Sequence, residues 1–164
     1  MIIRAWRITK TIFAPNAFSG KGAAEWGGRW NSPRTPVVYT AQSISLGCLE
    51  VLVGGVTVRH LVKRYSKIPV EFDNSFVTPI SSLPKDWNVF PAPVEDQRVG
   101  DLWAGKKASL VLKVPSSIVD GEFNYIINPL HPDATNLKIG PSEGISIDMR
   151  LIGLFTPPVT SSGR

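Results

Sequence analysis

The sequence predicts an α+β fold: a compact single domain with a mixed or antiparallel β core and short helices. Fourteen prolines and fourteen glycines are spread along the 164 residues and divide the chain into short elements. Strand-like segments outnumber helical ones, and no segment has long uninterrupted helical periodicity. No repeat appears at periods of about 20 to 50 residues, so a repeat architecture is not indicated.

The expected strands are short. Residues 2–8 mix Ile and Trp with Arg in the pattern of an edge strand. Residues 28–31 and 37–41 flank a turn with two prolines, so we expect them to pair as a hairpin that brings Tyr39 close to Arg29. Further strands are expected at 67–72, 108–114, 123–127 and 136–140.

Two helices are expected. Ser43 is a suitable N-cap for a helix over 44–53, in which apolar residues recur every four positions and which Gly54-Gly55 ends. A second, short helix lies near 94–104. The domain is expected to span 1–154, and the Pro-, Thr- and Ser-rich stretch 155–164 is expected to be a flexible tail.

Composition restricts the class of protein. Eighteen Lys and Arg against thirteen Asp and Glu give a net charge of +5, which suits a nucleic acid, an anionic small ligand or an acidic partner. Apolar residues interrupt the densest basic group, from Arg59 to Lys67, which favours a solvated basic face. No apolar stretch approaches the roughly 20 residues of a membrane span, and no signal peptide is evident, so we expect a cytoplasmic protein. A single cysteine, Cys48, excludes an internal disulfide and a cysteine-based zinc site.

The segment Gly27-Gly28-Arg29-Trp30-Asn31 is the first candidate for a functional site. Two glycines let the backbone bend tightly and let a ligand come close. The arginine offers N–H donors in a planar fork that suits phosphate. The competing interpretation is structural, with Trp30 in the core and Arg29 in a surface ion pair.

Tyr39 and Glu50 are the other two candidates. Tyr39 lies in an apolar run and is otherwise interpreted as a core tyrosine with a satisfied hydroxyl. Glu50 is the only charged residue from Ile44 to Gly55. Because a carboxylate is rarely buried unpaired, Glu50 either faces water or is held in a pocket by a partner, for which Arg29 is the candidate.

Other catalytic patterns are weak or absent. Ser116 and His131 allow a Ser-His hydrolase, but no G-x-S-x-G elbow accompanies them. His131 stands between Leu130 and Pro132, which favours a structural role. Gly20-Lys21-Gly22 fits neither a phosphate loop nor a dinucleotide fingerprint, and no H-E-x-x-H zinc motif is present.

Taken in order, these motifs resemble the RES family of bacterial toxins, which is named for an Arg, a Glu and a Ser. The resemblance covers about residues 3–152. Its segments are Trp6-Arg7-Ile8, Ser19-Gly20-Lys21-Gly22-Ala23, Gly27-Gly28-Arg29-Trp30-Asn31, Val37-Val38-Tyr39-Thr40-Ala41, Leu49-Glu50-Val51-Leu52, Gly100-Asp101-Leu102-Trp103, Val114-Pro115-Ser116, Glu122-Phe123-Asn124-Tyr125, Asn128-Pro129-Leu130-His131-Pro132 and Asp148-Met149-Arg150-Leu151. Arg34, where glycine is common, and Asp120-Gly121 depart from the family pattern.

The resemblance implies a fold similar to ADP-ribosyltransferase domains, NAD as the substrate in a cleft, and growth arrest by NAD depletion. It implies a cognate Xre antitoxin with a helix-turn-helix domain, through which alone nucleic acid would be contacted. By motif position the catalytic residues are Arg29, Tyr39 and Glu50. The substrate-binding residues are Arg29, Trp30, Asn31, Tyr39 and Ser116. Neither a metal ion nor a cofactor besides the NAD substrate is implied.

The expected chemistry is cleavage of the nicotinamide–ribose bond. Glu50 would stabilise the positive charge that develops on ribose, Arg29 would clamp a phosphate, Tyr39 would stack on nicotinamide, and Ser116 would orient the substrate. Water, phosphate or a protein side chain remain open as acceptors, and hydrolysis is expected because so short a chain has no visible target-binding insertion. The rival hypotheses are a nucleic-acid-binding or RNA-cleaving toxin, suggested by a pI of 9.6 and five tryptophans, and an inert antitoxin-binding protein.

Overall fold

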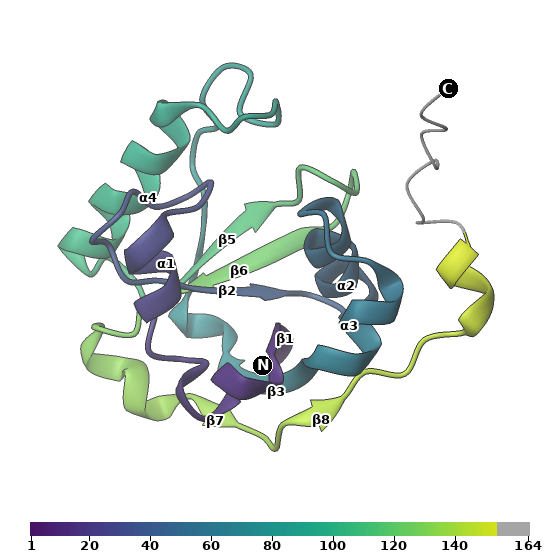
Figure 1. Ribbon diagram of the computed structural model, residues 1–164. Helices are drawn as coiled ribbons and strands as arrows, with labels where there is room; N and C mark the ends of the chain where they lie inside the picture. Colours follow the sequence, from purple (N-terminus) through teal and green to yellow (C-terminus); the bar gives the residue numbers. More distant parts are fainter. Residues whose placement is uncertain (154–164) are drawn as a thin grey trace.

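The computed structural model describes residues 1–153, the side chain of Met149 excepted, and its strands form one curled sheet (Figure 1). The expected tail, 155–164, lies outside the described residues. The strand order is β4-β5-β6-β2-β1-β3-β7, with β8 also on β3, and only β4 and β5 pair in parallel. The strands are β1 (Ile2–Lys10), β2 (Val38–Ala41), β3 (Tyr65–Asp73), β4 (Val77–Pro79), β5 (Val111–Pro115), β6 (Phe123–Ile127), β7 (Lys138–Ile139) and β8 (Glu143–Gly144).

Helices flank the sheet in two groups (Figure 1). Helices α1 (Lys21–Trp26) and α4 (Val94–Lys106) lie on one side of the view, and α2 (Ile44–Val53) and α3 (Val58–Arg64) on the other. Short 3-10 turns occupy Thr11–Asn16, Asn74–Phe76, Pro132–Asn136 and Met149–Gly153. The predicted α+β class, with a mostly antiparallel sheet and short helices, is confirmed.

The predicted helix over 44–53 is confirmed at both ends. The Leu46 amide donates to Ser43 Oγ at 3.1 Å, and Gly54 is the C-cap. The strands expected at 67–72, 108–114, 123–127 and 136–140 correspond to β3, β5, β6 and β7, and the expected helix near 94–104 is α4. Helix α3 was not expected. Its basic residues are exposed while Val58 and Leu61 are buried, so the densest basic group is a solvated face.

Two expectations about the first strands are wrong. Strand β1 is not an edge strand, because β2 and β3 pair with it on either side. Residues 28–31 do not form a hairpin with 37–41. They make a tight turn in which the Gly28 amide donates to the Asn31 carbonyl at 2.9 Å, while β2 pairs with β1 and β6. Two prolines and a left-handed Arg34, with φ of 80°, prevent a regular ladder between the two segments.

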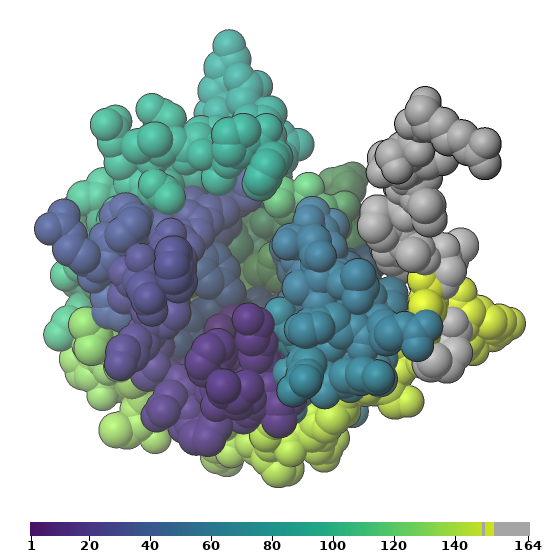
Figure 2. All heavy atoms as spheres, in the orientation of Figure 1, coloured from purple at the N-terminus to yellow at the C-terminus, as the bar shows by residue number. Residues whose placement is uncertain are grey.

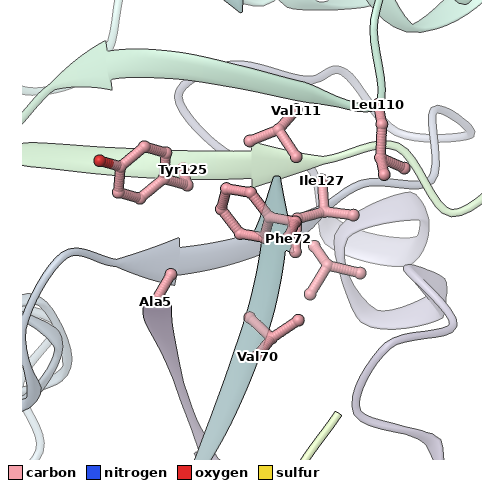
Figure 3. Close-up of a cluster of buried hydrophobic side chains, with 8 residues drawn as sticks. Ala5, Val70, Phe72, Leu110, Val111, Tyr125 and Ile127 are labelled. Atoms are coloured by element: carbon pink, nitrogen blue, oxygen red, sulfur yellow. The ribbon is translucent and has the colours of Figure 1, made fainter. Parts of the chain in front are cut away.

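The core has three clusters. The central one joins β1, β2, β3, β5 and β6 and includes an edge-to-face pair of Phe72 and Tyr125, with ring centroids 5.6 Å apart (Figure 3). A second lies between α4 and the other face of β5 and β6, around Trp103 and Trp30. The third packs α2 and α3 against β1, around Ile8 and Leu61. The second cluster therefore fixes α4 to the sheet, and the third fixes α2 and α3 to it.

No helix within residues 1–153 is by itself long and apolar enough to cross a bilayer. Helices α2 and α3 reach the necessary length and composition only jointly, as a pair bent by 119°.

Helix α4 touches the backbone of the 27–31 turn at Gly100. A Cβ at this position would overlap the carbonyl oxygen of Trp30 and stand 2.7 Å from its carbonyl carbon. Backbone atoms cannot yield as a flexible side chain does. The glycine therefore fixes how closely the helix approaches the residues that follow Arg29.

We expect Gly100→Ala to lower the free energy of unfolding by about 3 kcal/mol, because the added methyl group forces α4 away from Trp30. Gly105→Ala in the same helix is the matched control, since nothing lies within 4 Å of its Cβ position. That variant should be neutral or more stable by up to about 1 kcal/mol. Urea denaturation measures both, and equal stabilities of the two variants would contradict the close approach.

Candidate active site

A cavity of 330 Å³ opens between the 27–29 turn, β2 and α2, with β6 at its base. Figure 2 shows the surface hollowed between the segment leading into β2 and α2. Arg29, Tyr39 and Glu50 all line this cavity. Three residues predicted from separate motifs are thus brought to one site, although the hairpin expected to join the first two does not form.

Glu50 projects from α2, and two side chains hold its carboxylate. Asn124 Nδ2 donates to Glu50 Oε1 at 2.6 Å, and Ser116 Oγ donates to the same oxygen at 3.3 Å. Ser116 Oγ also accepts the amides of Ile118 and Val119, which leaves its proton for Glu50. Both donors are on Oε1, and no bond to Oε2 is formed by the described residues.

Ser116 and Asn124 differ in their relation to the cavity. Ser116 was expected to bind substrate, but it is 5% exposed and does not line the cavity. Its contact with the site is the hydrogen bond to Glu50. Asn124 does line the cavity and was missed as a site residue. Its motif, Glu122-Phe123-Asn124-Tyr125, was visible in the sequence, but the contact joins residues 74 positions apart.

Tyr39 presents its ring to the cavity while its hydroxyl is tied to the turn. The hydroxyl donates to Asn31 Oδ1 at 2.7 Å and accepts the Trp30 amide at 3.0 Å. A Cβ on Gly28 would stand 2.5 Å from that hydroxyl oxygen, so only glycine fits there. Burial raises the pKa of Tyr39. Both hydrogen bonds of the Tyr39 hydroxyl thus go to the turn that carries Arg29.

Arg29 is not the partner of Glu50; the expected pairing is wrong. Its Nη1 forms an ion pair with Asp96 Oδ2 at 3.2 Å and also donates to the Trp87 carbonyl, and Nη2 donates to the Val89 carbonyl at 3.1 Å. The Asp96 side chain is fully buried, and burial raises the pKa of its carboxyl group against the opposing effect of Arg29. Arg29 thus ties the segment before α4 to the rim of the cavity.

Trp30 and Asn31 are buried and do not line the cavity. Trp30 stacks on Trp87, with ring centroids 6.2 Å apart. Asn31 Nδ2 donates to the carbonyls of Ala23, Ser32 and Thr35. Both side chains shape the turn that carries Arg29 and binds the Tyr39 hydroxyl. For Trp30 this is the structural interpretation given in the sequence analysis, in which the side chain belongs to the core.

Arg7 is a cavity residue that the sequence reasoning missed. Strands β1 and β2 share a single register pair, Trp6 with Ala41, and beside it Arg7 Nη1 donates to the Tyr39 carbonyl at 3.1 Å. Arg7 Nε is buried without a hydrogen-bond partner, and no ion pair to Arg7 exists within residues 1–153. Burial lowers the pKa of Arg7. The signal was present, because Arg7 stands between Trp6 and Ile8 in β1, and a charged side chain among apolar neighbours needs a partner.

Residues away from the cavity show structural roles. His131 Nδ1 accepts the Asp133 amide and caps the turn Pro132–Asn136, so the structural interpretation of this histidine is confirmed. Within residues 1–153, no three His, Cys, Asp or Glu side chains gather closely enough to hold a metal ion.

Several known proteins are similar to this chain in sequence or in fold. A family model described as "RES domain" matches residues 4–148. The "Prs ADP-ribosylating toxin" of Sphingobium sp. is 36% identical over 90% of this chain and 95% of its own length. The "Toxin Res" of Photorhabdus laumondii is 35% identical over 78% of this chain and 83% of its own. In fold, the crystal structure of the M. tuberculosis MbcT-MbcA toxin-antitoxin complex contains a chain with a TM-score of 0.70 and 18% identity, covering 94% of this chain and 87% of that one.

The buried Arg29–Asp96 pair gives a prediction about stability. Arg29→Ala should lower the free energy of unfolding by about 3 kcal/mol, because it leaves the Asp96 carboxylate buried without a counter-ion. Arg29→Ala combined with Asp96→Ala should restore part of this loss. Arg98→Ala, on the exposed side of α4, is the control and should change stability little. Urea denaturation measures the free energy of unfolding of each variant. If the loss in the double variant equals the sum of the losses in the two single variants, Arg29 and Asp96 do not interact.

Proposed function

The chain belongs to the RES domain family, and on that premise we propose that it is the toxin of a toxin–antitoxin system and that it cleaves the bond between nicotinamide and ribose in NAD. The names of the relatives and the toxin-antitoxin complex that contains the structural neighbour support the first part of the proposal. The observation that carries the second part is the carboxylate of Glu50, fixed at Oε1 by Ser116 and Asn124 in one cavity with Arg7, Arg29 and Tyr39.

In the proposed reaction the bond between C1′ of ribose and the nicotinamide nitrogen breaks. Its electron pair leaves with nicotinamide, whose ring becomes neutral, and positive charge develops at C1′ and the ring oxygen of ribose. A carboxylate held beside that carbon stabilises the charge. Because Oε1 of Glu50 is already bonded, Oε2 is the atom left to face the ribose.

The cations of the site have separate roles in this proposal. The charge of Arg29 is balanced by Asp96, and three of its N–H groups are engaged, so it positions the cavity rim. Within residues 1–153 Arg7 has no carboxylate partner, so its charge is available and it is the better phosphate ligand. This moves the expected phosphate clamp from Arg29 to Arg7. The ring of Tyr39 would stack on nicotinamide.

The acceptor at C1′ is proposed to be water, which would give ADP-ribose and release a proton. Chain length does not distinguish water from a protein acceptor. The relative named as an ADP-ribosylating toxin aligns over 95% of its own length, so it has no large insertion for its target either. Transfer to a protein side chain is therefore the second candidate, favoured by that name.

An antitoxin partner is part of the proposal, because the structural neighbour was crystallised in a toxin-antitoxin complex. A partner of the Xre type would contribute a helix-turn-helix domain for DNA. The chain itself would then contact nucleic acid only through the partner, and purified chain should show no salt-sensitive binding to RNA or DNA.

Glu50→Gln should reduce the release of nicotinamide from NAD by a factor on the order of 10² to 10³, because the amide cannot balance the developing charge. The measurement is chromatography of NAD and nicotinamide over time with purified protein. Glu95→Gln, at an exposed position of α4, is the matched control and should retain full turnover. Unchanged turnover by Glu50→Gln in a folded protein would remove this residue from the mechanism.

Identification of the product tests the acceptor. With NAD and purified chain alone we expect free ADP-ribose, and added inorganic phosphate should not be required. Phosphate dependence would instead indicate phosphorolysis. If NAD is lost only in the presence of cell extract, and label from NAD appears on a protein band, the reaction is ADP-ribosyl transfer and not hydrolysis. No loss of NAD under any of these conditions would refute the enzyme proposal.

A further inference from the structure

A second cavity adjoins the first and remains unassigned by the proposed function. It has a volume of 580 Å³ and lies between the turn Thr11–Asn16 and α1. Among the described residues, Arg7 is the one that lines both cavities. We call this second space the α1 cavity; its defining residues are Arg7, Lys10, Phe13, Lys21 and Trp26.

The lining of the α1 cavity combines positive charge with exposed aromatic rings. Lys10 and Lys21 form no ion pair within residues 1–153, and Glu25 is the one carboxylate among the lining residues. Trp26 is 80% exposed and Phe13 is 55% exposed, although large aromatic side chains are usually covered. Cationic side chains without ion-pair partners can bind phosphates, and exposed aromatic rings can stack on a nucleobase. The lining therefore suits a nucleotide.

Size gives a second, independent argument. The first cavity, at 330 Å³, is at the lower limit of the spaces that hold small ligands, whereas a dinucleotide has two bases, two sugars and a diphosphate between them. A ligand whose nicotinamide ribose lies at Glu50 must therefore extend beyond that cavity. Arg7 lines both spaces, and no ion pair balances its charge within residues 1–153. A diphosphate that extends from one cavity to the other would pass this cationic side chain.

We propose that the α1 cavity binds the adenosine diphosphate half of the dinucleotide, an assignment that rests on NAD being the substrate. Arg7 and Lys21 hold the diphosphate, and the adenine lies against the indole of Trp26. The substrate then spans both cavities, with the reacting bond at Glu50 and the binding contacts of the adenosine half on α1.

Substrate truncation tests the assignment. Nicotinamide mononucleotide contains the bond to be cleaved but lacks the adenosine half. We expect Lys21→Ala and Trp26→Ala to raise KM for NAD by a factor on the order of ten. Trp26→Ala should leave kcat/KM for nicotinamide mononucleotide unchanged, because that substrate has no adenine. Lys63→Ala, at an exposed position of α3, is the control and should alter neither. If both variants keep the KM of the unmodified protein for NAD, the assignment is overturned.

A binding measurement separates this inference from the catalytic proposal. ADP, titrated into the unmodified chain by calorimetry, should bind and should compete with NAD, and Lys21→Glu should weaken its binding at least tenfold. ADP binding without NAD cleavage would leave the α1 site standing and refute the proposed reaction. NAD cleavage without ADP binding would refute the α1 site and leave the reaction intact. The substituted side chains are on the surface of α1, and thermal melting confirms that each variant folds.

Discussion

The candidate site depends on the half-buried guanidinium of Arg7, beside the single register pair that joins β1 and β2. Two neighbouring strands normally satisfy each other's backbone groups along their length, but here a single register pair is formed. Arg7 supplies the missing donor to the Tyr39 carbonyl and holds the strands at the separation that the cavities require. The positive charge of Arg7 has no carboxylate partner in residues 1–153. A bound anion would therefore be stabilised beside it.

The two arginines of the site contrast in how they are used. Arg29 has its charge balanced by a buried aspartate and its N–H groups directed at backbone carbonyls, so it behaves as part of the framework. Arg7 is held by one carbonyl and is otherwise unsatisfied. The motif of an arginine beside glycines does not show whether the arginine has a carboxylate partner. For Arg29 that partner, Asp96, lies 67 positions away in the sequence.

Local signals were sufficient for much of the fold and for part of the site. The helix of Glu50 was predictable from its Ser43 cap, its apolar spacing and its terminal glycines. The lone carboxylate left a wet face and a pocket open, and the structure has the pocket. The position of β1 inside the sheet, the failure of the hairpin and the partners of Glu50 were not predictable. Each is decided by pairing between distant segments, which no short window contains. Asn124 and Asp96 belong to this class.

The long-range character of the Glu50 contacts has a consequence for biosynthesis. Its two hydrogen-bond donors follow it by 66 and 74 positions, and both come from the second half of the chain. During translation Glu50 emerges first, while Ser116 and Asn124 have yet to be joined to the nascent polypeptide. A stalled or prematurely terminated product that ends before these residues carries the carboxylate without the groups that orient it. The ribosome therefore adds residue 124 before the Glu50 carboxylate can have both of its hydrogen-bond donors.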